Sequence, residues 1–330
     1  MNSLSDKRID VACLGELMID MSMDAFPDGI AGFKMYPGGA AANVAVGVAR
    51  MGMRPAIVCK ISRDYFGDYL QGICEENGVE TAAILRDDSR KVTLAFVTMD
   101  EARKPAYMFY RENTASSTLC PQELNQQVLR DSRVLYFSSM GLIRQPFRDA
   151  NYEAVRLVEE GGGLIAFDPN VRLHLWRDER EAREEIFRMM PHADILKVND
   201  EELAFLFGKR EVDRAALEHV RKHYPRLKLV AVTQGEKGVS LLGQSGAFAQ
   251  IPALDTRVVD TMGAGDSFFA ALLSEYLRLN RDMLDQDDLT KLGRYANAAA
   301  LLTAQKKGAI PALPMLEQVQ QKASEYEGRD

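Results

Sequence analysis

The chain has 330 residues, of which 46% are hydrophobic and 27% are charged, and its formal net charge at pH 7 is −7. This length and apolar content can bury a substantial core, fit one large α/β domain or two small ones, and exclude a disordered chain. Charges of both signs are interspersed with no long basic run, which argues against a nucleic-acid partner and against an anionic membrane surface.

The first third of the chain predicts short strands and two helices. Residues 9–19 form an apolar run broken at Gly15-Glu16, which predicts a buried first strand ending at Asp20. Residues 21–36 are polar and punctuated by Gly and Pro, so we expect them outside the core. The other elements expected here are a helix after Gly38-Gly39, a strand at 56–61, a helix at 64–77 stopped by Gly78, and strands at 92–99 and 106–111 joined as a hairpin by the charged turn 100–104.

From residue 134 onward, apolar β runs alternate with helical stretches. This alternation predicts a mostly parallel sheet covered by helices on both faces, in which ligands bind beyond the carboxyl ends of the strands. Polar residues stand just after five of the apolar runs, namely Asp20, Asp168, Asn199, Thr233 and Asp260. The strands expected in this part are 134–137, 164–167, 195–198, 229–233 and 239–242, with helices such as 151–160 and 182–190 between them.

A glycine-rich stretch at residues 260–266, with the sequence DTMGAGD, is the most informative in the chain. Val258-Val259 predicts the end of a buried strand before it, and the residues after it continue as a helix without Gly or Pro. Backbone N–H groups at a helix start can bind an anion such as a phosphoryl group, and Asp266 would then be a nearby base. The alternative is that Asp266 only caps the helix, with the glycines shaping the turn.

A second stretch at residues 37–52, PGGAAANVAVGVARMG, is similar to the other half of a known pair of motifs. Together the two stretches resemble the paired motifs of the ribokinase-like (PfkB-type) carbohydrate kinases, in the family's order, within a resemblance that extends over about residues 10–314. It implies one ribokinase-like α/β kinase domain over residues 1–330, with a small β lid formed by about 21–36 and 91–111. The sequence contains no GxxxxGK[ST] element, so a Walker-type NTPase is not expected.

The resemblance also implies the chemistry, which is transfer of the γ-phosphoryl group of ATP to a primary hydroxyl of a sugar. Asp266 is then the base, and the backbone N–H groups of Gly263, Ala264 and Gly265 form the anion hole. Residues this small let the backbone approach phosphate oxygens without an intervening side chain.

Sugar-binding residues follow from the resemblance as well. Asp20 matches the carboxylate that holds sugar hydroxyls, although a turn residue at a strand end is the alternative. Gly38, Gly39 and Asn43 match sugar-contact positions, and Asn43 is otherwise a costly choice in an Ala/Val-rich helix.

Two further elements place charges near the substrate. Asp168 and Arg172 belong to a DPNVR stretch that resembles the DPNxR element of fructokinases, where Arg helps to hold substrate or phosphate. Tyr110 and Arg111 end a lid strand where family members place a cation over the substrate. The alternatives are an Asp-Pro turn with a surface Arg172 and an exposed strand-end Arg111.

The nucleotide site implied by the resemblance uses three separate loops. Asn199 and Glu202 match an NxxE element that orders Mg²⁺ and its waters, although they also read as the acidic first turn of an ordinary helix. Thr233, Gly235 and Gly238 match a TxGxxG loop near ATP, and as bare sequence they are the turn of a hairpin. Asn297 corresponds to a residue near the adenine, and the carbonyls of Asp260 and Met262, with the Gly308-Ala309 loop, resemble a monovalent-cation (K⁺) site.

One departure from the family pattern narrows the range of candidate substrates. Ribokinases usually carry Lys where this chain has Ala40, which favours the fructokinase-like branch and fructose. Tyr110-Arg111 and residues 114–117 resemble the YRxxSA element of 2-keto-3-deoxygluconate kinase, the nearest alternative. Aminoimidazole riboside kinase, nucleoside kinases and a non-catalytic sugar sensor also remain open, although a sensor would not need Asp266.

The remaining features concern location and assembly. Cys13, Cys59, Cys74 and Cys120 form neither a CxxC pair nor a disulfide-like cluster, and residues 1–8 lack the apolar segment of a secretion signal. No run approaches the roughly 18 apolar residues of a membrane span, so we expect a cytoplasmic enzyme. A homodimer formed through the β lid is the one macromolecular assembly that we expect.

Overall fold

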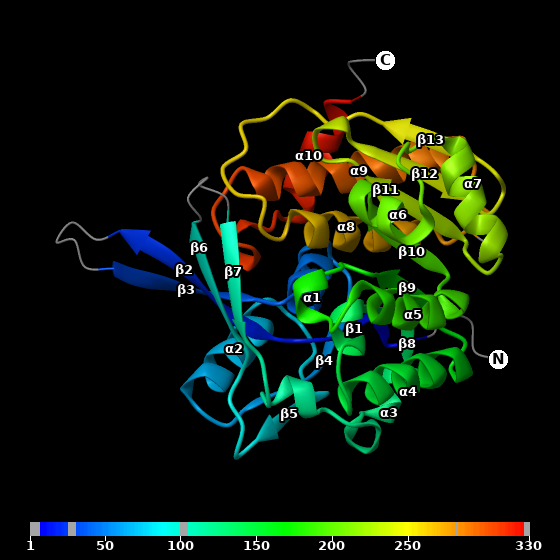
Figure 1. Ribbon diagram of the computed structural model, residues 1–330. Helices are drawn as coiled ribbons and strands as arrows, with labels where there is room; N and C mark the ends of the chain where they lie inside the picture. The colour runs from blue at the N-terminus through cyan, green and yellow to red at the C-terminus, as the bar shows by residue number, and fades with distance from the viewer. Residues whose placement is uncertain (1–6, 26–30, 100–104, 282, 327–330) are drawn as a thin grey trace.

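The computed structural model describes residues 7–25, 31–99, 105–281 and 283–326, and these residues form two sheets (Figure 1). The larger sheet has nine strands in the order β13-β12-β11-β10-β9-β8-β1-β4-β5. It is parallel except at one edge, where β12 is antiparallel to both β11 and β13. Its strands are β1 (Ile9–Leu14), β4 (Pro55–Ser62), β5 (Ile84–Asp87), β8 (Ser132–Ser138), β9 (Leu164–Asp168), β10 (Ile195–Asn199), β11 (Leu229–Thr233), β12 (Val239–Gly243) and β13 (Phe248–Ile251).

Helices cover both faces of this sheet, as the alternating sequence predicted. In β1, Val11 and Cys13 pack into the core shared with α1, α2, α8 and α9, whereas Ala12 and Leu14 pack into the core shared with α3 to α7. Strands buried on both faces are apolar throughout, which is why the sequence showed continuous β runs. The helices are α1 (Ala40–Arg50), α2 (Tyr65–Glu76), α3 (Gln126–Arg130), α4 (Phe147–Glu160), α5 (Glu179–Met189), α6 (Asp200–Phe207), α7 (Arg214–His223), α8 (Ala264–Leu279), α9 (Gln286–Ala304) and α10 (Leu316–Ser324).

The smaller sheet projects from one side of the body (Figure 1). Its four strands lie in the order β3-β2-β6-β7, namely β3 (Ala31–Gly38), β2 (Met18–Ala25), β6 (Leu94–Met99) and β7 (Pro105–Tyr110). The hairpin predicted at 92–99 and 106–111 is confirmed as the antiparallel pair β6 and β7. Its expected turn at 100–104 lies outside the described residues.

The first predicted strand is wrong in one respect. The apolar run 9–19 divides at Gly15-Glu16 into β1 of the large sheet and β2 of the small sheet. Gly15 packs so closely on α1 that an added Cβ would lie 2.6 Å from the Cβ of Ala41. Asp20 therefore lies within β2, paired with Tyr36, and not at the carboxyl end of a core strand.

The other expected strand ends agree with the structure except for one. Asp168, Asn199 and Thr233 are the last residues of β9, β10 and β11. Val258 and Val259 do not end a buried strand, because they lie in an irregular segment and are 47% and 50% exposed. Within the described part of the chain, no helix has both the length and the apolar character needed to span a membrane.

Candidate active site

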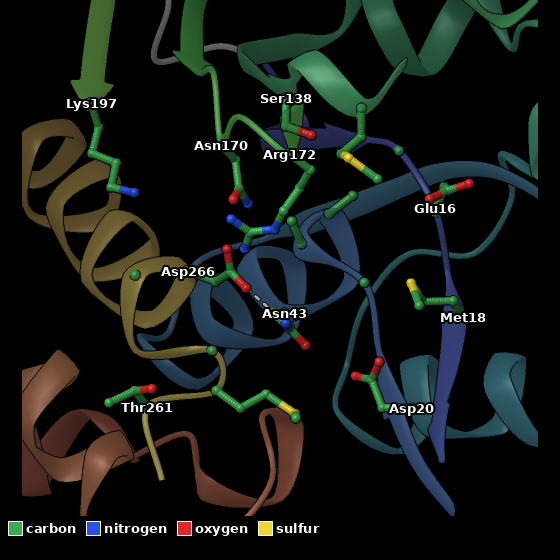
Figure 2. A pocket seen from close by; sticks show the side chains of 18 of the residues that line it. Glu16, Met18, Asp20, Asn43, Ser138, Asn170, Arg172, Lys197, Thr261 and Asp266 are labelled. Atoms are coloured by element: carbon green, nitrogen blue, oxygen red, sulfur yellow. Dashed lines mark hydrogen bonds between the residues drawn. The ribbon is translucent and has the colours of Figure 1, made fainter. Parts of the chain in front are cut away.

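A cavity of about 360 Å³ opens where the carboxyl ends of β8, β10 and β11 meet the first turns of α1 and α8 and the inner face of the small sheet (Figure 2). The large sheet contributes Ser138, Lys197, Asn199 and Thr233, and the loop after β9 contributes Asn170 and Arg172. The two helices and the small sheet bring in Asn43, Asp266 and Asp20, and the segments that lead into β2 and α8 add Glu16 and Thr261. Segments from most of the length of the chain thus meet in this cavity.

Asp266 is held by a residue of the other glycine-rich stretch. Asn43 Nδ2 of α1 donates a hydrogen bond of 2.7 Å to Asp266 Oδ2 of α8 (Figure 2). The two helices can pack closely because Gly47 faces Ala270, where an added Cβ would lie 2.6 Å from the alanine Cβ. The capping interpretation of Asp266 is not borne out, since Gly263 is the N-cap residue and no side chain caps α8.

Opposing effects act on the Asp266 carboxyl group. Burial raises its pKa, while the Asn43 hydrogen bond and the positive charges of Lys197 and Arg172 lower it, and the net shift is upward. A carboxylate with a raised pKa is a stronger proton acceptor than an ordinary Asp. The site can therefore take a proton from a group that binds beside Asp266.

The turn that leads into α8 presents backbone to the cavity. Gly263 has a φ of 74°, and an added Cβ would lie 2.8 Å from the Cβ of Ala309, so only glycine fits there. Gly263 and Gly265 line the cavity, whereas Ala264 does not, and the Ala264 N–H donates to the Thr261 carbonyl at 3.2 Å. The N-terminal end of a 16-residue helix with two glycines is suited to an anion.

Two cations stand beside Asp266. Arg172 reaches toward it from the loop after β9, and Lys197 enters from β10 (Figure 2). Asp168 does not line the cavity; it is fully buried, and its Oδ2 accepts a hydrogen bond from Lys197 Nζ at 3.1 Å. Burial raises the pKa of Asp168, against the opposing effect of Lys197.

Asp20 faces the cavity from the small sheet. Burial, together with the negative charges of Asp266 and Asp260, raises its pKa to about 7. Gly38 is needed beside it, because an added Cβ would lie 2.1 Å from Asp20 Oδ2. Gly39 has a φ of 100°, and an added Cβ would lie 2.2 Å from the Glu16 carbonyl oxygen, so only glycine fits where β3 passes into α1.

Tyr110 and Arg111 do not line this cavity. Neighbouring residues of a strand point to opposite faces, so Phe109 lines the cavity and Tyr110 lies on the outer face of the small sheet. Arg111 Nη2 donates to Glu16 Oε1 at 3.2 Å and to the Met140 carbonyl at 3.2 Å. The expected cation over the substrate is thus paired with a buried carboxylate.

The NxxE element forms the start of α6. Asn199 Oδ1 accepts from the Glu202 N–H at 2.7 Å, and Glu202 Oε2 accepts from the Asn199 N–H at 2.9 Å. Glu202 Oε1 also accepts from the Val171 N–H at 2.7 Å, which ties the loop that carries Arg172 to α6. Burial raises the pKa of Glu202 despite the nearby Lys197, and only Asn199 of the two lines the cavity.

The other expected nucleotide residues differ in their placement. Thr233 lines the cavity, whereas Gly235 and Gly238 form the turn between β11 and β12 with φ values of 55° and 95°. Asn297 is buried and lies outside the cavity, where its Nδ2 donates to the carbonyls of Ile251 and Pro252 at 3.2 and 3.3 Å.

Asp260 joins two of the loops expected at the cation site. Its Oδ1 accepts from the Met262 N–H and its Oδ2 from the Gly308 N–H, both at 3.0 Å. No cluster of three or more His, Cys, Asp or Glu side chains arranged to hold a metal ion occurs among the described residues.

Sequence reasoning missed several residues that line the cavity, including Glu16, Phe109 and Lys197. Lys197 left a signal, since it is the one charged residue within the apolar run of β10. Phe109 could have been separated from Tyr110 only by knowing which face of β7 is covered.

Comparisons with known proteins agree with this geometry. The family described as "pfkB family carbohydrate kinase" matches residues 8–316. A probable fructokinase-4 from Arabidopsis thaliana is 39% identical over 313 residues, which cover 94% of this chain and 95% of the relative. The crystal structure of a fructokinase with bound ATP from Xylella fastidiosa has a TM-score of 0.87 at 28% identity, covering 96% of this chain and 99% of that one. An aminoimidazole riboside kinase from Salmonella enterica, complexed with aminoimidazole riboside and an ATP analog, has a TM-score of 0.80 at 28% identity, with the same two coverages.

Proposed function

The chain belongs to the pfkB family of carbohydrate kinases, and we propose that it transfers the γ-phosphoryl group of ATP to a primary hydroxyl of fructose. The observation that carries this proposal is the Asn43–Asp266 pair at the start of α8, flanked by Lys197 and Arg172. It unites a proton acceptor, an anion-binding helix end and two positive charges. Similarity to fructokinases over most of the chain supports fructose as the acceptor.

Asp266 is the general base of this reaction. It takes the proton of the attacking hydroxyl as the new bond between that oxygen and phosphorus forms and the bond to ADP breaks. Asn43 fixes the carboxylate through Oδ2 and leaves Oδ1 to face the sugar. The N–H groups of Gly263 and Gly265 then face the transferring phosphoryl group, with Ala264 excluded because its N–H is already donated.

The sugar lies between Asp20 and Asp266. Asp20 accepts hydrogen bonds from sugar hydroxyls, and Gly38 and Gly39 make room for that carboxylate and for the sugar. We assign the small sheet the role of a lid on a one-domain kinase, because its inner face carries Asp20 and Phe109. Closing it over the sugar would keep out water, which competes for the phosphoryl group.

A neutral sugar suits the charges better than a keto-acid does. The Arg111 guanidinium is already paired with Glu16, which is itself buried, so it needs no substrate carboxylate. This observation supports fructose over 2-keto-3-deoxygluconate, the nearest alternative. Arg172, which faces Asp266, then serves the phosphoryl group.

The nucleotide end fits MgATP. Asn199 and Thr233 line the cavity at strand ends, and Gly235 and Gly238 form the adjoining turn. Mg²⁺ keeps several of its waters, so it suits a site where Asn199 and Glu202 act through water and the nucleotide phosphates. When bound, Mg²⁺ neutralises phosphate charge and orients the γ-phosphoryl group.

Three further proposals concern a monovalent-cation site, the oligomeric state and the cellular location. A monovalent cation would use the carbonyls of Asp260 and Met262, supported by the link from Asp260 to the Gly308 loop. A homodimer would form through the outer face of the small sheet, which is apolar and exposed. A cytoplasmic location is supported by four cysteines that are all free thiols.

A screen of ADP release tests the substrate assignment. The purified protein would be incubated with MgATP and, separately, fructose, 2-keto-3-deoxygluconate, ribose, aminoimidazole riboside and nucleosides. We expect kcat/KM for fructose to exceed every other by at least about tenfold, roughly 1.4 kcal/mol of transition-state discrimination. A higher value for the keto-acid would replace fructose by that substrate, and no ADP release with any of them would favour a sensor.

A further inference from the structure

A buried lysine in the middle of a core strand supplies one of the two positive charges that flank the Asn43–Asp266 pair. Lys197 is the third residue of β10, its neighbours Leu196 and Val198 are fully buried, and it is itself only 6% exposed. Placing an ammonium group there is costly unless it is paired or used.

Its pairing is incomplete. Lys197 Nζ donates to Asp168 Oδ1 at 3.3 Å and to Oδ2 at 3.1 Å, so one carboxylate occupies two of its three N–H groups. Among the described residues, no other side chain or carbonyl accepts a hydrogen bond from this nitrogen. The same side chain lines the cavity, whereas Asp168 lies behind it and is fully buried.

The ammonium group lies against the turn that faces the phosphoryl group. An added Cβ on Gly265 would lie 3.4 Å from Lys197 Nζ, so this nitrogen is adjacent to the first turn of α8. Figure 2 shows the side chain reaching from β10 toward that turn, on the side of Asp266 away from Asp20. Asp20 belongs to the sugar end, so the ammonium group stands at the phosphate end.

Lys197 also remains charged in this position. Burial lowers its pKa, but the negative charges of Asp168 and Glu202 outweigh burial, and the net shift is upward. A lysine whose pKa is raised does not compete with Asp266 for the proton of the sugar hydroxyl. Its contribution must be electrostatic.

We propose that Lys197 is a catalytic residue whose ammonium group binds the non-bridging oxygens of the phosphoryl group as it passes from ATP to the sugar, and that Asp168 is a positioning residue that holds it there. The proposal rests on the kinase function proposed above and deepens it. The bond from phosphorus to the ADP oxygen breaks, the bond to the sugar oxygen forms, the hydroxyl proton goes to Asp266, and Lys197 keeps all of its protons. It supplies the phosphate-binding lysine that a chain without a Walker element otherwise lacks.

The competing interpretation is a structural ion pair. A buried ion pair adds little net stability relative to neutral residues of similar size, but removing one partner alone leaves a costly buried charge. The informative variant is therefore the double substitution Lys197→Met/Asp168→Asn, which removes both charges together. Lys197→Arg is its companion, because it keeps the pair with Asp168 but replaces the compact ammonium group beside Gly265 with a planar guanidinium.

The experiment combines kinetics with nucleotide binding. We expect the double variant to unfold within a few degrees of the wild type, to bind fructose with an unchanged Kd, and to lose about 10²- to 10³-fold in kcat, the usual scale for one electrostatic contact in a transition state. In calorimetric titrations without sugar, the preference of the wild type for a non-hydrolysable ATP analogue over ADP should shrink about tenfold in the variant, while ADP binding is unchanged. Lys197→Arg should lose at least about tenfold in kcat.

Several outcomes would overturn the proposal. One is a folded double variant whose kcat is within about threefold of the wild type, and another is an equal loss of affinity for ADP and for the analogue. If the double variant does not fold, Lys197→Arg decides, and a wild-type rate there overturns the proposal. The nucleotide titrations need no sugar, so they remain valid if fructose proves to be the wrong substrate, which the wild-type kinetics alone would reveal.

Discussion

At the scale of single residues, Asp20 titrates close to neutral pH, because burial and the nearby Asp266 raise its pKa to about 7. Below pH 7 the carboxyl group is protonated, and above it the carboxylate is available to accept hydrogen bonds from sugar hydroxyls. Sugar binding favours the ionised form, so affinity should rise with pH. We expect the Kd for fructose to fall about tenfold between pH 6 and pH 8 and to level off above that range.

Calorimetric titrations at several pH values check this prediction, with Asp20→Asn as the control. The Asn variant should bind fructose more weakly at pH 8 and show almost no pH dependence. A variant that keeps the wild-type pH dependence would assign the titration to another group. Equal losses of fructose and ATP affinity would instead indicate a damaged fold.

Much of the site could be predicted at this scale, because motif positions report local chemistry. Asp266, Asn43, Asp20, Arg172, Asn199 and Thr233 all line the cavity. The ion-pair partners of these and neighbouring charged side chains could not be predicted from the sequence. That Arg111 faces Glu16, or that Asp168 faces Lys197, depends on how strands distant in sequence lie side by side.

At the scale of elements, the passage from β3 into α1 depends on Gly39. Its φ of 100° is strained for any other residue, and an added Cβ would also lie 2.2 Å from the Glu16 carbonyl oxygen. Gly78 offers a matched control, since its φ is 73° but an added Cβ there meets nothing within 4 Å. We expect Gly39→Ala to lower the free energy of unfolding by more than about 3 kcal/mol, and Gly78→Ala by only about 1–2 kcal/mol.

Urea unfolding of the two variants measures this difference, and fructose kinetics add a second readout. Gly39→Ala displaces the start of α1 and with it Asn43, so its fructose KM should rise, whereas Gly78→Ala should leave KM unchanged. Equal losses of stability would mean that the contact with Glu16 is readily relieved.

Arg111, which follows β7, pairs with Glu16 in the connection between β1 and β2, and this ion pair helps to distinguish the two leading candidate substrates. Arg111→Gln leaves Glu16 buried without its cation, so it should destabilise the protein by about 1–3 kcal/mol, while Arg172→Gln should cost much less because Arg172 is exposed. We expect fructose binding without nucleotide to survive both substitutions. Strong wild-type binding of 2-keto-3-deoxygluconate, abolished by either substitution, would make the keto-acid the substrate.

A helix whose capping residues are visible in the sequence could be predicted, whereas very short strands and the change from one sheet to the other could not. Helix α2 begins at Asp64, whose side chain accepts from the Phe66 and Gly67 N–H groups, and a left-handed glycine follows its end at position 78. In contrast, β5 and β13 have only four residues each, which is too short for a periodic pattern to predict a strand. The run 9–19 is mostly apolar on both sides of Gly15-Glu16 because both of its strands are buried, and that hid the change of sheet at Gly15.

At the scale of the whole molecule, the outer face of the small sheet is an exposed apolar surface. Four large apolar side chains are exposed to solvent on this face, namely Met23, Phe33, Met108 and Tyr110. The Phe96 ring makes edge-to-face contacts with the rings of Phe33 and Tyr110, at centroid separations of 5.2 and 5.3 Å. Soluble monomers rarely leave such a patch uncovered. We expect sedimentation velocity to give a dimer for the wild type and a monomer for Met23→Lys/Met108→Lys.

Met315→Lys is the control, because that methionine is also exposed but lies before α10, outside the small sheet. It should leave the dimer intact. A wild type that is monomeric at micromolar concentration would contradict the proposed homodimer. A dimer that persists in the double variant would place the interface elsewhere.

Asp266 is proposed to take the proton of a fructose hydroxyl, and a comparison of the wild type with Asp266→Asn tests this role. The Asn side chain can still accept the hydrogen bond from Asn43 through its oxygen, so the geometry of the pair is kept while the base is lost. We predict that kcat for fructose phosphorylation falls by about 10²- to 10⁴-fold while the fructose Kd changes by less than about threefold. A variant that retains more than about a tenth of the wild-type kcat would contradict the assignment of Asp266 as the base.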